Sequence, residues 1–186
     1  LDGAAMKRLG IAVANVAGGS NTALAEYTVS LALVLMRRFA WADAEIKKGN
    51  YVDFRKQMIS ENLTGLEDMT VGVIGLGSIG LAVATAFHRM GSKIVYHDPA
   101  LKDPTDADQI SALALPLEDV LKLSDVVTLH VPLIPETEGL IGDTQLSSMK
   151  PGSILIHAAR GGVVDEMALA QHLTTGHIGG AAVDVY

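Results

Sequence analysis

The stretch that decides the fold is Thr70–Asp98, which reads TVGVIGLGSIGLAVATAFHRMGSKIVYHD. Its first apolar run, Val71–Gly75, has the length and β-branched content of a buried parallel strand. Three glycines then form a G-x-G-x-x-G pattern, at Gly75, Gly77 and Gly80. Apolar residues recur at helical spacing until Gly91, and Lys93–His97 forms a second apolar run. The order strand, glycine turn, helix, strand predicts a βαβ unit.

The three glycines stand where a dinucleotide-binding site needs residues without a side chain. Gly75 permits a tight turn, Gly77 lets a pyrophosphate approach the backbone, and Gly80 lets the helix pack close to the strand. Unpaired N–H groups at the start of the helix then favour phosphate. Asp98 ends the second strand 23 positions after Gly75, close to the spacing of a carboxylate that bonds the adenosine ribose 2′-OH. Such a carboxylate repels a 2′-phosphate, so the sequence predicts NAD rather than NADP. The alternative is a purely structural βαβ turn.

The totals describe a globular chain. Its 186 residues fit one domain, or one domain plus a fragment, and 49% are hydrophobic against 19% charged. The net charge of −7 argues against nucleic acid or an anionic membrane as partner. The absence of cysteine excludes disulfides, thiolate metal sites and cysteine nucleophiles, and it fits a reducing cytoplasm, the predicted compartment. The acidic residues lack EF-hand spacing, so no metal site is predicted.

The first residues are expected to belong to another domain. Asp2–Leu9 is predicted to be a short helix and Ile11–Ala14 a strand, followed by a loop over Asn15–Asn21. These elements precede the glycine motif and have no obvious partners in the sequence. Because the chain also begins with Leu1 and without a basic and apolar leader, we interpret 1–20 as the remnant of a second domain in a longer protein.

Thr22–Lys48 is predicted to be one long helix capped by Asn21. Between Tyr27 and Met36 it is apolar nearly all round, although this run is too short to cross a membrane. Such a helix must be covered on several sides, either by the two domains together or by a second subunit. The sequence favours the subunit interface.

The rest of the chain alternates helices and strands after a polar crossover, Gly49–Glu67. The expected elements are a helix at Leu117–Leu123, a strand at Asp125–His130, a helical turn at Thr144–Met149, a strand at Ser153–His157, a helix from an Asp165 cap to about Gly176, and a strand at Gly180–Val185. This alternation predicts an α/β fold with a doubly wound parallel sheet of the Rossmann type over residues 21–186.

Several segments together resemble the D-isomer-specific 2-hydroxyacid dehydrogenases, including the phosphoglycerate dehydrogenases. They are GIAVAN (Gly10–Asn15), AEYT (Ala25–Thr28), VGVIGLGSIG, YHDP, LHVPLIPETEGLI (Leu129–Ile141) and MKPGSILIHAARGGVVDEMAL (Met149–Leu169). The resemblance implies hydride transfer between NAD and C2 of a small D-2-hydroxy or 2-oxo acid. It also implies a split, flavodoxin-like substrate domain around the Rossmann domain, and a homodimer formed through the cofactor domains.

The resemblance also assigns residues to parts of the coenzyme. It implies backbone contacts to the pyrophosphate from Ser78 and Ile79, a border of the adenine and ribose from Val131 and Pro132, and a nicotinamide end formed by Ala158, Ala159, Arg160 and Asp184. Arg160 matches the substrate-binding arginine and is the catalytic candidate. A permanently charged planar donor can hold a carboxylate and polarise the C2 carbonyl that receives hydride.

The resemblance also indicates what this chain lacks and where it departs from the family. The family's catalytic histidine and its partner glutamate are expected beyond Tyr186, so the isolated chain is predicted to bind NAD without turnover. His157 stands where the family commonly has asparagine; it is either a donor near the nicotinamide or a neutral structural histidine, and the structural role is favoured. The alternative to an oxidoreductase is a non-catalytic NAD-sensing or scaffold protein on the same fold.

Overall fold

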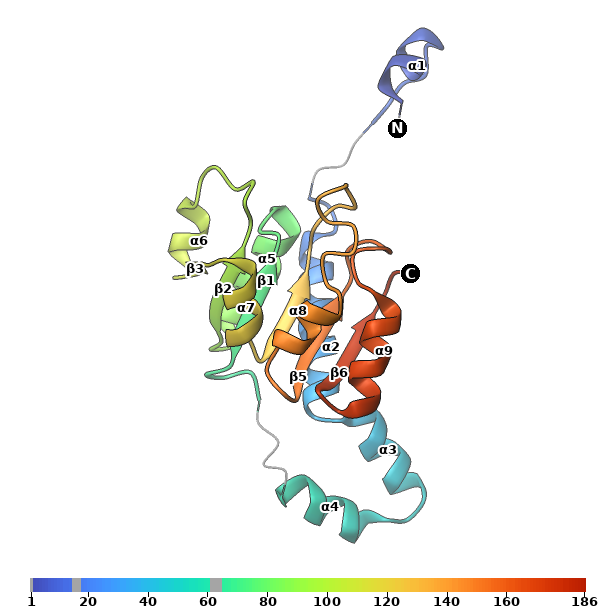
Figure 1. Cartoon of the computed structure of the whole chain (residues 1–186), viewed down its shortest axis with the longest axis vertical. Coiled ribbons are helices and arrows are strands. Elements are labelled where there is room, and N and C mark those ends of the chain that lie inside the picture. The colour runs from blue at the N-terminus through green and yellow to red at the C-terminus, as the bar shows by residue number, and fades with distance from the viewer. Residues whose placement is uncertain (1, 15–17, 61–64) are drawn as a thin grey trace.

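One parallel sheet forms the centre of the molecule (Figure 1). The computed structural model describes residues 2–14, 18–60 and 65–186. Within these residues the sheet has six strands in the order β3-β2-β1-β4-β5-β6, all of them parallel. The strands are β1 (Thr70–Ile74), β2 (Lys93–His97), β3 (Leu113–Ala114), β4 (Val126–Leu129), β5 (Ser153–His157) and β6 (Ile178–Val183).

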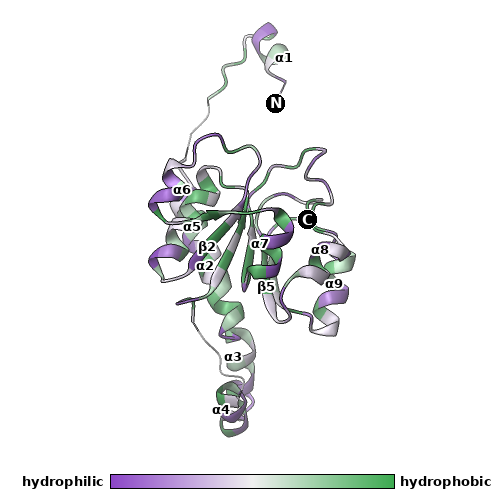
Figure 2. Cartoon of the chain, turned by 60° about the vertical axis from the view of Figure 1, so that its left-hand side comes forward, coloured by the Kyte–Doolittle hydropathy of each residue, from purple (hydrophilic) through white to green (hydrophobic). Residues whose placement is uncertain are grey.

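Helices cover both faces of the sheet, as the alternating pattern predicts. One face carries α2 (Asn21–Met36), α5 (Ser78–Arg89) and α6 (Thr105–Gln109), and the other carries α7 (Leu117–Leu123), α8 (Asp143–Ser148) and α9 (Glu166–Thr175). Adjacent residues of a strand therefore enter different cores: Val73 packs with the first set of helices and Ile74 with the second. Figure 2 shows hydrophobic central strands between these helical layers. The doubly wound Rossmann fold is confirmed.

The carboxyl ends of the strands align in one row. Ile74 pairs with His97 of β2 and with Leu129 of β4. Leu129 pairs in turn with His157 of β5, which pairs with Val183 of β6. The residues that follow these five positions therefore lie along a single edge of the sheet. The strand order reverses between β1 and β4, and at such a switch point open α/β sheets hold their ligands.

At the opposite edge, Asp125 holds the amino ends of three strands together. Its Oδ2 accepts the Thr70 N–H at 2.8 Å, and its Oδ1 accepts Lys150 Nζ at 2.8 Å. Its backbone oxygen accepts the Ile154 N–H at 2.9 Å. The aspartate that the sequence places at the start of a strand is therefore an alignment residue of the sheet.

The single long helix expected over Thr22–Lys48 is wrong. The structure has α2 and then α3 (Phe39–Lys47), separated at Arg38, whose φ of 51° lies in the left-handed region. The Arg38 guanidinium carbon lies 4.4 Å from the centroid of the Trp41 ring, a cation–π contact between the break and α3. Asn21 is not the cap either, since it is the first helical residue and Ser20 precedes the helix without a side-chain capping bond.

Other differences occur where the sequence lacks strong periodicity. The helix α1 (Gly3–Arg8) is present, but residues 11–14 form no strand, because no described segment pairs with them and Ile11 and Val13 are exposed. The expected polar crossover contains a helix, α4 (Tyr51–Ser60), which packs its buried Phe54 on Trp41 of α3 at 5.2 Å between ring centroids. The short α6 and β3 were not predicted. Parts of the expected loop 15–21 and crossover 49–67 lie outside the described residues. No described helix is long and apolar enough to cross a membrane.

Candidate functional site

The glycine turn joins β1 to α5 through very close backbone packing. Gly75 has φ of +88°, and a Cβ there would lie 2.7 Å from the His130 carbonyl oxygen and 2.8 Å from Val131 Cγ1. A Cβ on Gly80 would overlap the Gly75 carbonyl oxygen. Gly75 is therefore restricted to glycine by conformation and by packing, and Gly80 by packing alone.

Gly77 differs from the other two glycines because it faces open space. A Cβ there would meet no atom within 4 Å, and the residue is exposed. Gly77 is the N-cap residue of α5, and it has no side chain that could bond the first N–H groups of the helix. The first N–H groups of α5, at Ser78 and Ile79, have no partner within the helix by its geometry. An open backbone and a helix N-terminus thus meet at the edge of the sheet, which suits a phosphate group.

Asp98 lies directly beside this turn. Its Oδ2 accepts the Leu76 N–H at 2.7 Å, and its Oδ1 accepts the Ala100 N–H at 2.9 Å. A carboxylate offers about four lone-pair positions, so each oxygen retains acceptor capacity. Asp98 also borders a hollow of about 480 Å³ at the carboxyl end of β2, with Tyr96, Pro99 and Leu115 among its lining residues.

His130, the residue that follows β4, packs against the glycine turn. Its Nε2 lies 2.9 Å from Thr128 Oγ1, and its Cβ lies 3.5 Å from the position of a Cβ on Gly80. Burial lowers the pKa of His130 to about 4, so the imidazole is neutral at pH 7. Val131 follows it half-buried and Pro132 exposed, so these two expected site residues lie next to the glycine turn.

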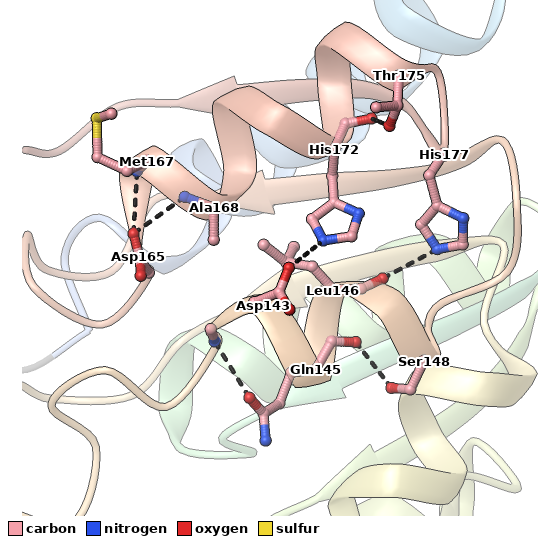
Figure 3. Close-up of polar contacts among 11 residues, drawn as sticks. Asp143, Gln145, Leu146, Ser148, Asp165, Met167, Ala168, His172, Thr175 and His177 are labelled. Atoms are coloured by element: carbon pink, nitrogen blue, oxygen red, sulfur yellow. Dashed lines mark hydrogen bonds and ion pairs between the residues drawn. The ribbon is translucent and has the colours of Figure 1, made fainter.

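The segment after β5 presents Arg160 at the same edge. Ala158 and Ala159 are largely covered, whereas Arg160 is exposed and its Nη1 donates to the Ala159 carbonyl oxygen at 2.6 Å. The loop that follows pairs with the segment before α8, because Val163 O accepts the Ile141 N–H at 3.1 Å. Asp165 then caps α9 by accepting the N–H groups of Met167 and Ala168, both at 3.0 Å, as Figure 3 shows. The predicted cap is confirmed.

His157 is buried beneath this segment. Only 2% of the residue is exposed, and its Nδ1 has no hydrogen-bond partner among the described residues. Burial lowers its pKa. A neutral, covered imidazole supports the structural role over that of a proton carrier.

Asp184 completes the row at the end of β6. Its N–H donates to the His157 carbonyl oxygen at 2.9 Å, and its carboxylate is exposed. Its Oδ1 accepts the hydroxyl of Tyr27 from α2 at 3.1 Å. The two side chains are 157 positions apart, so the helical pattern of α2 gives no sign of this contact.

His172 and His177 pack against α8 and do not contact the residues of the candidate site described above. His172 Nε2 lies 2.9 Å from Asp143 Oδ1, and His177 Nε2 lies 3.1 Å from the Leu146 carbonyl oxygen (Figure 3). The first contact joins α8 to α9, and the second joins α8 to the residue directly before β6. Among the residues with described positions, no group of three or more histidine or acidic side chains could hold a metal ion.

Comparison with known proteins identifies relatives along the whole chain. The family described as "D-isomer specific 2-hydroxyacid dehydrogenase, NAD binding domain" matches residues 29–186. D-3-phosphoglycerate dehydrogenase of Archaeoglobus fulgidus is 39% identical over 177 residues, 95% of this chain and 32% of the relative. The human D-3-phosphoglycerate dehydrogenase is 37% identical over 182 residues, 98% of this chain and 33% of the relative. The chain thus spans about one third of the length of these curated relatives.

Solved structures agree with this relationship. A D-lactate dehydrogenase with NAD+ from Lactobacillus jensenii superimposes with a TM-score of 0.86 at 34% identity, covering 100% of this chain and 54% of that one. The apo form of Rhodotorula graminis D-mandelate dehydrogenase has a TM-score of 0.88 at 30% identity, covering 100% and 55%.

The glycine turn predicts opposite results for two matched substitutions. Gly75→Ala should lower the free energy of unfolding by about 2 kcal/mol or more, because the added methyl meets backbone and Gly75 has a left-handed φ. Gly77→Ala should change it by less than about 0.5 kcal/mol. Urea unfolding followed by circular dichroism compares the two variants. Equal losses of stability would contradict the packing described for the turn.

The neutral state of His130 predicts a loss of stability in acid. The folded pKa of about 4 lies below the ordinary value of 6.5, so the unfolded chain binds a proton first as the pH falls. The His130 contribution is complete above about pH 6.5 and should decline by about 3 kcal/mol as the pH approaches 4. Urea unfolding of the wild type and of His130→Gln across this range should show a smaller decline in the variant. Parallel curves would show that His130 is not the group responsible.

Proposed function

The chain belongs to the D-isomer specific 2-hydroxyacid dehydrogenases and contains their NAD-binding domain, and from this premise we propose that it serves NAD-dependent hydride transfer at C2 of a D-2-hydroxy or 2-oxo acid. The observation that carries this proposal is the open backbone at Gly77 beside the fixed carboxylate of Asp98. Because the chain spans a third of its curated relatives, we assign it coenzyme binding and place the acid/base step outside these residues.

The residues present fit NAD. The N–H groups of Ser78 and Ile79 would hold the pyrophosphate at the α5 N-terminus, where Gly77 leaves its approach open. Asp98 would accept the adenosine ribose hydroxyl, and Val131 with Pro132 would border the adenosine end. When bound, NAD supplies the nicotinamide that accepts or returns the hydride.

Four further residues would form the nicotinamide end: Ala158, Ala159, Arg160 and Asp184. Ala158 and Ala159 would flank the ring without adding a competing charge. The exposed Arg160 guanidinium would hold the substrate carboxylate and polarise the C2 oxygen, which orients the substrate for hydride transfer. The Asp184 carboxylate would accept an N–H of the nicotinamide amide. Each role rests on the position of the residue at the carboxyl edge of the sheet.

We further propose that residues 1–20 belong to a second domain, that 21–186 form the cofactor domain, and that the protein works as a homodimer in the cytoplasm. The dimer is supported by a groove of about 670 Å³ between α2 and α5, lined in part by Ala25, Ala82 and Ala86. Small residues there would let a second subunit approach closely. The absence of cysteine fits a reducing compartment.

Coenzyme choice tests the proposed function. Calorimetric titration should show saturable binding of NADH and much weaker binding of NADPH, because the Asp98 carboxylate repels a 2′-phosphate. Asp98→Ala should weaken NADH binding about tenfold or more. It should also bring the dissociation constants of NADH and NADPH closer together. Asp98→Asn keeps an acceptor for the Leu76 N–H and controls for loss of the turn. If the wild-type chain did not bind NADH, the proposed function would be wrong. If both variants kept the full preference for NADH over NADPH, the assignment of Asp98 would be wrong.

The proposed subunit interface has its own test. Light scattering should show a dimer of the wild-type chain, and Ala86→Arg should shift it to monomer because a buried charge would face the groove. Ala170→Arg, the same change on exposed α9 at the other face of the sheet, is the control and should stay dimeric. A wild-type chain that is monomeric at every concentration would refute the interface.

A further inference from the structure

Tyr27 makes a contact that the coenzyme site as outlined above does not explain. Its helix α2 buries Ala25, Thr28 and Ala32 towards α5 and the sheet. Tyr27 projects elsewhere, with 40% of its surface exposed, and donates its hydroxyl to Asp184 Oδ1 at 3.1 Å. The hydrogen bond to Asp184 is the main reason why the pKa of Tyr27 is raised, so the phenol remains a protonated donor.

Asp184 is held at its backbone but depends on Tyr27 for the direction of its side chain. Its N–H is fixed on the His157 carbonyl oxygen at the edge of the sheet. In the described part of the chain, the Tyr27 hydroxyl is the one donor to its carboxylate. Without that donor, the exposed side chain would sample several rotamers. With it, one oxygen is engaged and the second is available to another donor.

A carboxylate with one oxygen already hydrogen-bonded can distinguish a carboxamide group of a ligand from a ketone group. Its second oxygen can accept an N–H of a carboxamide, whereas an acetyl group of the same shape offers no donor and places its own carbonyl or methyl there. A carboxylate held in one direction discriminates more strongly than a mobile one, because less conformational freedom is lost when the amide binds.

We propose that Tyr27 is a positioning residue for Asp184 and thereby determines how strongly the site prefers the nicotinamide carboxamide. The inference rests on the proposed function, since it takes the Asp184 side of the edge to be the nicotinamide end. Tyr27 acts through Asp184 and takes no part in hydride or proton transfer. It also links α2, which lines the proposed subunit groove, to the coenzyme site.

The test uses NADH and its reduced 3-acetylpyridine analogue, which replaces the carboxamide by an acetyl group. Preference is the ratio of the two dissociation constants, measured by calorimetry on the 186-residue chain. The wild type should prefer NADH, and Tyr27→Phe should reduce that preference about three- to tenfold, mainly by weakening NADH. Tyr51→Phe removes a hydroxyl from another exposed tyrosine, on α4, and should leave the preference unchanged.

A purely structural role for Tyr27 gives a different result. If the hydroxyl only joined α2 to β6, Tyr27→Phe would lower the thermal midpoint or weaken both coenzymes by the same factor, and the unchanged preference would overturn the inference. Asp184→Ala provides the second check, because in that background Tyr27→Phe should no longer change the preference. An effect that persisted without Asp184 would also overturn it. A wild-type chain that failed to bind NADH would instead refute the proposed function on which the inference rests.

Discussion

The close approach of β1, α5 and β4 at the glycine turn is the constraint on which the rest of the site depends. Gly80 packs on the Gly75 carbonyl, and Gly75 packs on the backbone of His130, with no room for a side chain at either place. This contact sets the start of α5 directly above the edge of the sheet. Gly77, the one glycine of the motif that faces open space, then leaves the helix N-terminus accessible.

The sheet brings segments that are far apart in the sequence to one edge. Its strands end in register at Ile74, His97, Leu129, His157 and Val183. The next residue of each strand begins a site segment, so the glycine turn, Asp98, the segment that starts at His130, the segment before Arg160, and Asp184 share one edge. At the other edge, Asp125 keeps the strand starts aligned through Thr70 and Lys150. Alignment of β1, β4 and β5 at their amino ends therefore carries through to the site, because these three strands are only four or five residues long.

The charges at this edge are arranged locally, although the whole chain carries −7. Among the histidines that end or follow strands at this edge, His130 and His157 have pKa values lowered by burial and stay neutral. The full charges are those of Asp98 beside the turn, Arg160 in the loop after β5, and Asp184 at the end of β6. Neutral groups thus support the backbone from beneath, and charged groups face solvent where a ligand can reach them.

The sequence by itself determined the βαβ unit, the bounds of β2, β5 and α7, and the Asp165 cap, because strong apolar periodicity, glycine and capping chemistry act within a few residues. It also indicated the family through the glycine motif and the segment around Arg160. Only the tertiary structure decided the break at Arg38, the helix α4, the missing strand at 11–14 and the bond between Tyr27 and Asp184. The break occurs at a left-handed residue whose guanidinium lies over the Trp41 ring, and a strand requires a partner strand. The tyrosine bond needs α2 and β6 to meet in space, and side chains 157 positions apart leave no local signal of that meeting.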